Sequence, residues 1–455
     1  MKSFYYILLC LFLVLSFSCK NDKQVEANSL TDTVEEDETT PSDPLTANFL
    51  TLSDVHLDDS LGMVGYGSVS GDSIWKRTIR KIDSVSKHEK PRFMVYLGDL
   101  PNYYSNITHN IGEVLKDFRD LDGDFPILYL PGNNDTMKGD YHSFQDGVSP
   151  NGTTIFSLDD VPTNPWPIIN RNSKTTTISN LDFNKEFGYY SVDLNVDKEV
   201  LKVVALNSVI FCRKGRHNHY RPNDGVSQDS AAQNQFSWLE KTIDGFDTTD
   251  NVLLMMHIPP GRDGHGFNGD NMWNDNLYVT DKNGNSVKVQ NGFLDLLKNN
   301  QPKIRGMLTS HTHLDGLRRI YAADDNTDPN KLITVSISTP GISLNHNNNP
   351  GFKSFEFNIT DFELINFKTY YAEPTAKTNP ESYNNFNFKY ISKPYTFKDT
   401  YKITDPSTSI FTDIKGLKDA SSINGYMKQI LGVYTKDPNV TSGFYYDHAL
   451  DVLYQ

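Results

Sequence analysis

Two residues that can bind metals, Asp54 and His56, are separated by one position and follow a short apolar run. Side chains at i and i+2 of an extended segment point to the same side, so this carboxylate and imidazole can reach one cation. Four later apolar runs end in residues of the same kind. The candidate metal ligands are Asp54, His56, Asp99, Asn133, His257, His311 and His313. Nitrogen and oxygen ligands around one shared carboxylate are what two adjacent divalent cations require.

Strands must position these ligands, and the apolar runs that precede the ligands predict five such strands. They cover 49–53, 93–97, 127–130, 252–256 and 304–309, with further strands at 189–192 and 201–206. Helical spacing of apolar residues predicts helices at 73–88 and 111–121. A third helix is predicted to open at Asp229 with a capping box and to run through Ile243. Alternating strands and helices predict an α/β fold, in which sites lie at the carboxyl ends of the strands.

The N-terminus carries a pattern typical of export. An apolar run at 7–17 predicts a signal peptide at 1–18, which is too short for a comfortable membrane span. Small residues precede Cys19 and resemble a bacterial lipoprotein processing site, so we expect a lipidated Cys19 that anchors the chain to a membrane. Plain secretion is the alternative. Residues 19–47 are acidic and are expected to form a disordered tether. The expected location is the bacterial outer membrane, periplasm or cell surface.

Composition limits the classes of partner. The 455 residues include 57 Asp and Glu against 43 Lys and Arg, a formal net charge of -14. Duplex nucleic-acid binding needs a basic face, which this composition does not indicate. Of three cysteines, Cys212 is the one in the expected mature body, so no intramolecular disulfide is expected there. No sequence feature indicates an obligate protein partner.

The order Asp-x-His, Gly-Asp, Gly-Asn-x-Asp, His and x-His-x-His resembles the calcineurin-like metallophosphoesterases. Within them, four stretches resemble the acid sphingomyelinase-like phosphodiesterases: Leu52-Ser-Asp-Val-His-Leu-Asp58, Gly98-Asp-Leu-Pro101, His257-Ile-Pro-Pro-Gly261, and Ser338-Thr-Pro-Gly-Ile-Ser343 through Asn349-Pro-Gly-Phe352. Purple acid phosphatases differ, because they carry Tyr where this chain has Asn102. The resemblance covers roughly 49–371.

The resemblance implies a four-layer α/β/β/α sandwich at 48–372, followed by a partly helical extension at 373–455, with helices expected at 421–433 and 445–453. It also assigns ligands to two divalent cations. The first would take Asp54, His56 and His313, the second Asn133, His257 and His311, with Asp99 bridging. Zinc is the first expectation, and manganese or iron also suits these ligands. A hydroxide shared by the cations would attack phosphorus without a protein nucleophile.

One position departs from the family. Its members usually have His after the motif's Asn, where it stabilises the transition state and protonates the leaving oxygen, and this chain has Asn134. An amide donates hydrogen bonds but is no general acid near neutral pH. Poor leaving groups would then depend on another donor, for which His142 and His265 are candidates, unless they are surface histidines. His346 is expected at the rim of the cleft. A cluster at 216–219 is either a second small ligand group or a solvated loop.

The expected function is metal-dependent hydrolysis of a phosphodiester, such as a phospholipid head group or a nucleotide derivative. A phosphomonoesterase or nucleotide phosphatase is the nearest alternative, because the same dimetal core serves both. A ligand-binding lipoprotein that has lost catalysis is the alternative from another class. The 24 Tyr and 26 Phe suit such a role, and Asn134 would fit the loss of chemistry. Metal content separates these classes.

Overall fold

The computed structural model describes residues 45–65, 67–102, 107–136, 138–144, 166–170, 173–213, 220–222, 225–263, 270–346, 348–374, 388–416 and 451–455. The expected signal peptide, Cys19, His265 and the histidines of the 216–219 cluster lie outside these residues. Within the described ranges, none of the helices combines the length and apolar character that crossing a membrane requires.

The first sheet has its parallel strands at the centre. In the described chain its order is β18-β17-β16-β1-β4-β5-β6, with β19 beside β17. The strands are β1 (Thr46–Leu52), β4 (Met94–Tyr96), β5 (Ile127–Tyr129), β6 (Ile168–Ile169), β16 (Gly351–Asn358), β17 (Leu364–Pro374), β18 (Phe388–Tyr390) and β19 (Tyr395–Thr396). β1, β4 and β5 run parallel, whereas β16 pairs antiparallel to β1.

The second sheet has the order β14-β15-β13-β10-β9-β8-β7. Its strands are β7 (Thr176–Asn184), β8 (Tyr189–Val196), β9 (Glu199–Leu206), β10 (Asn251–Met256), β13 (Ile304–Thr309), β14 (Gly316–Tyr321) and β15 (Leu332–Ser338). β9, β10, β13 and β15 are parallel. Two small ribbons pair β2 (Leu57–Asp58) with β3 (Ser70–Gly71), and β11 (Tyr278–Thr280) with β12 (Ser286–Lys288).

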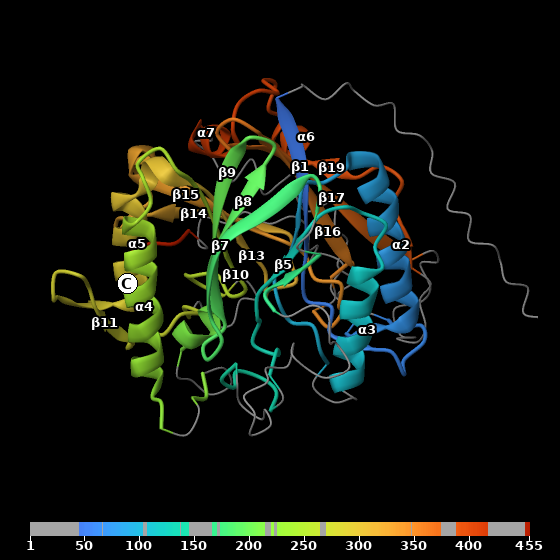
Figure 1. Ribbon diagram of the computed structural model, residues 1–455, viewed down its shortest axis with the longest axis horizontal. Helices are drawn as coiled ribbons and strands as arrows, with labels where there is room; N and C mark the ends of the chain where they lie inside the picture. Colours follow the sequence, from blue (N-terminus) through green and yellow to red (C-terminus); the bar gives the residue numbers. More distant parts are fainter. Residues whose placement is uncertain are drawn as a thin grey trace, which may run out of the picture. The chain divides into compact units, whose positions relative to one another are not determined.

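Helices cover the outer faces of the two sheets (Figure 1). α2 (Asp72–Glu89) and α3 (Ile107–Arg119) pack on the first sheet, and α4 (Gln228–Asp244) and α5 (Val289–Asn299) on the second. Alternation along β10 separates two cores: Leu253 and Met255 pack with the first sheet, whereas Leu254 and Met256 pack with α4 and α5. The four-layer α/β/β/α sandwich is therefore confirmed.

Short 3₁₀ turns and two C-terminal helices complete the described elements. The turns are η2 (Ser208–Phe211), η3 (Gln301–Lys303) and η4 (Pro329–Lys331), and the helices are α6 (Phe397–Tyr401) and α7 (Ile410–Gly416). Both helices bury apolar side chains in the core of the first sheet, among them Phe397 and Ile410.

Two local expectations are wrong. The N-cap of α4 is Ser227, whose side chain accepts from the backbone N–H of Ser230, so the helix opens before Asp229. The end of the helix expected at 445–453 is extended, because Val452 bridges Ile320 at the edge strand β14 and Asp451 pairs with Arg319. The helix expected at 421–433 lies outside the described residues.

Candidate metal centre

The ligand-bearing residues follow the carboxyl ends of parallel strands in both sheets. β1, β4 and β5 of the first sheet and β10 and β13 of the second all end at this site. Two groups of side chains that could hold a metal ion form there, each with ligand atoms within 4.8 Å of one another. The first group is Asp54, His56 and His313, and the second is Asp99, His257 and His311. The family resemblance led us to expect the same three residues in the first group, but Asn133 with His257 and His311 in the second, with Asp99 bridging the two.

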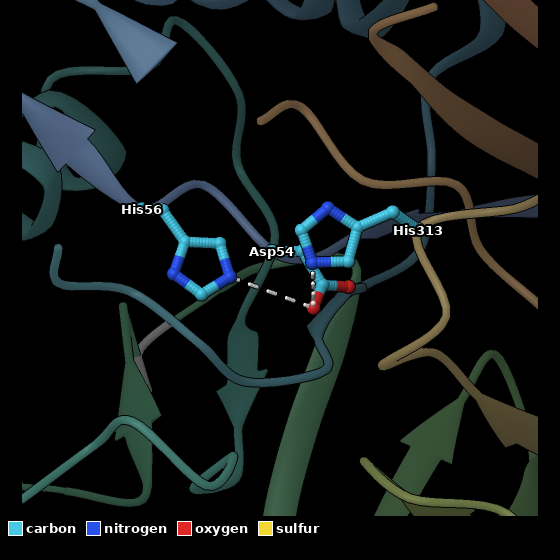
Figure 2. A group of neighbouring side chains, drawn as sticks. All are labelled: Asp54, His56 and His313. Carbon is cyan, nitrogen blue, oxygen red and sulfur yellow. Dashed lines mark ion pairs between the residues drawn. The ribbon is translucent and has the colours of Figure 1, made fainter. Parts of the chain in front are cut away.

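The first group centres on the carboxylate of Asp54. Figure 2 shows the rings of His56 and His313 approaching this carboxylate from different segments of the chain. His313 Nε2 lies 3.3 Å from Asp54 Oδ1, and His56 Nε2 lies 3.9 Å from the same oxygen. One carboxylate oxygen facing two imidazole nitrogens is a suitable ligand set for a divalent cation.

Asp99 joins the two groups. Its Oδ2 lies 3.1 Å from His257 Nε2 in the second group and 3.5 Å from His56 Nε2 in the first. His257 Nε2 is also 3.7 Å from Asp54 Oδ1. Asp99 therefore occupies the position expected of a carboxylate shared by two cations.

Backbone carbonyl groups fix the orientation of three histidines. Their Nδ1 atoms lie near carbonyl oxygens, at 3.2 Å for His56 and Pro101, 2.6 Å for His257 and Leu97, and 3.5 Å for His313 and Ser343. An Nδ1–H that donates to a carbonyl leaves the Nε2 lone pair available to a metal. In each ring this available nitrogen faces the carboxylates.

The backbone at the ligands is held in an unusual conformation. Positive φ angles occur at Asp54 (49°), His56 (42°), Asp99 (61°), His311 (72°) and His313 (57°). Residues with a Cβ seldom adopt this left-handed region, and such strain concentrates at functional sites. Gly98 before Asp99 has φ 100°, and a Cβ there would lie 2.5 Å from Gly132 N. The tight approach of these two loops therefore requires the glycine.

Two buried oxygens at the site fit a bound cation. Asn133 Nδ2 donates to Asp140 Oδ1 at 2.8 Å, which leaves its amide oxygen as the ligand atom. Asn133 Oδ1 and Asp54 Oδ1 are both buried and have no hydrogen-bond partner among the described residues. Buried polar atoms without a partner are rare and need a cause such as an ion. The ligand set therefore suits divalent metal ions.

Asn134 contacts the shared carboxylate. Its backbone N–H donates to Asp99 Oδ1 at 2.8 Å, and its side-chain Nδ2 donates to Asp99 Oδ2 at 2.7 Å. Asn134 thus orients Asp99, a role that an amide can fulfil without titrating.

Sequence reasoning missed two supporting residues. Asp135 is buried and accepts three backbone N–H groups, from Asp99 (2.7 Å), Gly132 (2.6 Å) and Leu100 (2.9 Å), and so ties the β4 and β5 loops together. The hydroxyl of Ser310 donates to Asp54 Oδ2. Asp135 belongs to the Gly-Asn-x-Asp motif, which could have signalled its importance, whereas Ser310 had no signal besides its position before His311.

The other candidate histidines that the structure describes, His142 and His346, lie in different surroundings. His142 is half-buried, and its Nε2 lies 3.0 Å from Arg221 Nη1. Its neighbour Tyr141 has its hydroxyl 3.4 Å from His311 Nε2. His346 is exposed, and its ring centroid lies 4.5 Å from that of His313. Tyr141, which sequence reasoning did not select, and His346 therefore flank the two ligand groups.

The charges of the site are strongly coupled. Burial disfavours the charged form of Asp99, but the His257 and His56 imidazoles and the Asn134 N–H outweigh it and hold its pKa below the ordinary range. Burial raises the pKa of Asp54. Burial opposes protonation of His257, but Asp99 and Asp54 raise its pKa to about 9. In the metal-free protein, a proton on His257 therefore offsets part of the carboxylate charge.

This proton predicts how the stability of the metal-free protein depends on pH. The folded pKa of His257 lies above its ordinary value of 6.5, so the stabilisation is complete below pH 6.5 and is lost as the pH rises through about 9. With chelator present, we expect the thermal midpoint to fall across that window, and His257→Asn to flatten the fall. His109→Asn, at an exposed imidazole paired with Asp59, is the control. A wild-type midpoint that stays constant across the window would contradict the prediction.

Comparison with known proteins defines the family. The model of the calcineurin-like phosphoesterase family matches residues 47–315, more than half of the chain. The chain belongs to this family. Together with its two ligand groups, this membership defines a dinuclear metallophosphoesterase.

Individual relatives within the family include named phosphodiesterases. The mouse (Mus musculus) cyclic GMP-AMP phosphodiesterase SMPDL3A is 24% identical over 338 residues, covering 72% of this chain and 67% of the relative. Sphingomyelinase phosphodiesterase C of Dictyostelium discoideum is 23% identical over 334 residues, 69% of this chain and 65% of its own. Among solved structures, PhoD is 9% identical with a TM-score of 0.44, covering 76% of this chain and 68% of PhoD. The two sequence relatives confirm the predicted resemblance to acid sphingomyelinase-like phosphodiesterases.

Proposed function

We propose that this protein hydrolyses a phosphodiester, of the phospholipid head-group or nucleotide type. The observation that carries the proposal is that Asp99 lies close to histidines of both ligand groups, in a chain similar to named phosphodiesterases. Four histidines in the ligand set favour zinc, and manganese or iron also fits these donors.

Two divalent cations, when bound, stabilise charge on phosphoryl oxygens and make water a nucleophile at neutral pH. The residues of the chain prepare this chemistry. Backbone carbonyls fix the histidine rings, and Asn134 and Asp135 hold Asp99 and its loop. The hydroxyl of Tyr141 and the imidazole of His346 are placed beside the ligands, where they can donate hydrogen bonds to a phosphate ester.

Hydrolysis of bis(4-nitrophenyl) phosphate beside 4-nitrophenyl phosphate tests the diester preference. We expect chelator-sensitive turnover with a higher kcat/KM for the diester, restored by added zinc or manganese. A higher kcat/KM for the monoester would overturn the proposal in favour of the phosphomonoesterase alternative. Metal binding without turnover of either ester, or of phospholipid and nucleotide diesters, would favour the ligand-binding alternative.

Replacing Asn134 tests how the leaving group is protonated. We expect Asn134→His to accelerate hydrolysis of alkyl diesters, which are poor leaving groups, by about 10²-fold or more, as a general acid does. Hydrolysis of nitrophenyl diesters, whose leaving groups need no proton, should change little. Asn134→Gln adds bulk without an acid and is the matched control. If Asn134→His hydrolyses each of the two classes of diester at the wild-type rate, the hypothesis is refuted.

We also propose that the chain is exported and anchored to a bacterial membrane through a lipidated Cys19. The apolar run at 7–17 and the small residues before Cys19 support this proposal. Labelled fatty acid should be incorporated into the wild-type protein in cells and should be absent from Cys19→Ser. Equal labelling of the two, or no labelling of either, would contradict lipidation.

A further inference from the structure

A buried ion pair lies just beyond the second histidine of the His311/His313 loop. Asp315 Oδ1 lies 2.6 Å from Lys353 Nζ, and both side chains are fully buried. Thr369 Oγ1 donates to Asp315 Oδ2 at 2.8 Å, and the hydroxyl of Tyr395 donates to the same oxygen. Lys353 Nζ also donates to Thr369 Oγ1 at 2.8 Å. We call these four residues, Asp315, Lys353, Thr369 and Tyr395, the inter-sheet cluster.

The inter-sheet cluster connects the two sheets of the sandwich. Asp315 directly precedes β14 of the second sheet, whereas Lys353, Thr369 and Tyr395 belong to β16, β17 and β19 of the first. The ammonium of Lys353 also lies 3.6 Å from the centroid of the Phe367 ring on β17. The loop that carries His311 and His313 is therefore fastened, at its far end, to strands that contribute no ligand themselves.

Net stability does not explain such a pair. Two fully buried charges lose their hydration, and well-packed apolar residues of similar volume are often equally stabilising or better. Apolar side chains would not, however, fix the direction of the chain at Asp315, because their contacts are not directional. Buried charges with several hydrogen bonds define one arrangement instead.

The loop needs such a constraint at both ends. His311 and His313 both have left-handed backbone conformations, which the surrounding structure must maintain. At the near end, the backbone N–H of Ser310 donates to His257 O at 2.9 Å, and its hydroxyl lies within hydrogen-bond distance of Asp54 Oδ2 and Thr339 O. At the far end, the Gly341 N–H donates to His313 O at 3.2 Å, and Gly316 pairs with Ser338 of β15. The inter-sheet cluster, two residues from His313, adds a charged contact to the first sheet.

We propose that the inter-sheet cluster is a positioning device for His313, and hence for metal binding by the Asp54, His56 and His313 group. This inference rests on the proposed dinuclear function and goes beyond it by assigning a role to residues that touch neither metal nor substrate. Residues that hold a ligand in place typically contribute 10–100-fold to metal affinity, so an effect of about that size is expected. The Asp99, His257 and His311 group, further from Asp315 along the loop, should be affected less.

The test compares two buried lysines. Lys353→Met keeps an unbranched side chain, one atom shorter, and removes its charge, and Tyr395→Phe is a milder change that removes one hydroxyl. Lys398→Met is the matched control, because Lys398 lies 2.6 Å from Asp413 in another nearly buried pair, between α6 and α7. Metal-free forms of each variant are titrated with Co²⁺, following its visible absorption together with the heat of binding.

We expect wild type to bind two Co²⁺ ions, and Lys353→Met to weaken one of them by about 10–100-fold while the other stays within threefold. Tyr395→Phe should weaken the same ion less, and Lys398→Met should weaken neither. If Lys353→Met does not fold, the result for Tyr395→Phe decides. The inference would be overturned if a folded Lys353→Met bound both Co²⁺ ions with wild-type affinity. If Lys353→Met does not fold, wild-type affinity in Tyr395→Phe has the same meaning. Equal weakening in Lys398→Met would also overturn it. Wild type that binds no metal would instead refute the proposed function.

Discussion

Asp99→Asn should abolish nearly all phosphodiester hydrolysis and lower the affinity for both metal ions. Asp99 is the carboxylate that approaches histidines of both ligand groups, at 3.1 Å from His257 Nε2 and 3.5 Å from His56 Nε2. A neutral amide removes the negative charge that would bind the two cations together. We expect the substitution to lose several kcal/mol of metal-dependent transition-state stabilisation. A loss of this size lowers kcat/KM on the order of 10³-fold or more.

The control for this substitution is Asp193→Asn in β8. Asp193 is also mostly buried and pairs with Lys202 at 3.2 Å, but it belongs to none of the ligand groups. We expect its kcat/KM and metal content to match those of wild type. The account would be contradicted if Asp99→Asn retained two tightly bound metals and more than a tenth of wild-type activity.

Asp135→Asn should destabilise the fold and weaken metal binding together. The carboxylate of Asp135 accepts three backbone N–H groups from the loops that follow β4 and β5. Burial and the neighbouring Asp99 raise the pKa of Asp135 to about 7, so its carboxylate is charged above that pH. There each hydrogen bond to the charged group contributes about 1.5–3 kcal/mol. The amide presents its own N–H groups to these donors, so a loss of roughly 3 kcal/mol in the free energy of unfolding is expected. Denaturant titration of metal-free and metal-loaded protein measures both effects.

Asp281→Asn provides a matched comparison. Asp281 also accepts backbone N–H groups, from Asn283 (2.9 Å) and Asn285 (2.8 Å), but in an exposed turn between β11 and β12. Its replacement should destabilise the fold much less than that of Asp135, because water can satisfy the donors there. Equal destabilisation by the two substitutions would show that the position of Asp135 between the two ligand loops has no special importance.

The candidate metal ligands could be selected from the sequence because each follows a strand with a strong apolar pattern. Val252–Met256 is apolar throughout, so a polar side chain at His257 must emerge where the strand ends. Convergence then follows from topology, since parallel strands bring their carboxyl ends to one edge. The expected pairing of the ligands into two groups came from the resemblance to the calcineurin-like metallophosphoesterases.

Residues that act through other residues could not be predicted in this way. Lys353 lies in a strand and has no metal-binding chemistry, and its contact with Asp315 spans 38 positions and two sheets. Tyr141 reaches His311 from a left-handed backbone conformation (φ 59°), which no local pattern indicated. Val452 pairs with the edge strand β14, and tertiary contact of this kind overrides the helical pattern of its own segment. Such features depend on the assembled fold.

Metal content measured beside hydrolysis tests the central claim most directly. Purified protein should carry two divalent metal ions per chain by elemental analysis, and chelation should remove both along with bis(4-nitrophenyl) phosphate hydrolysis. Adding back zinc or manganese should restore the two together, with activity rising as the second ion binds. Hydrolysis that persists in protein shown to be free of metal, or a preparation that binds fewer than one ion per chain at saturating metal, would contradict the account.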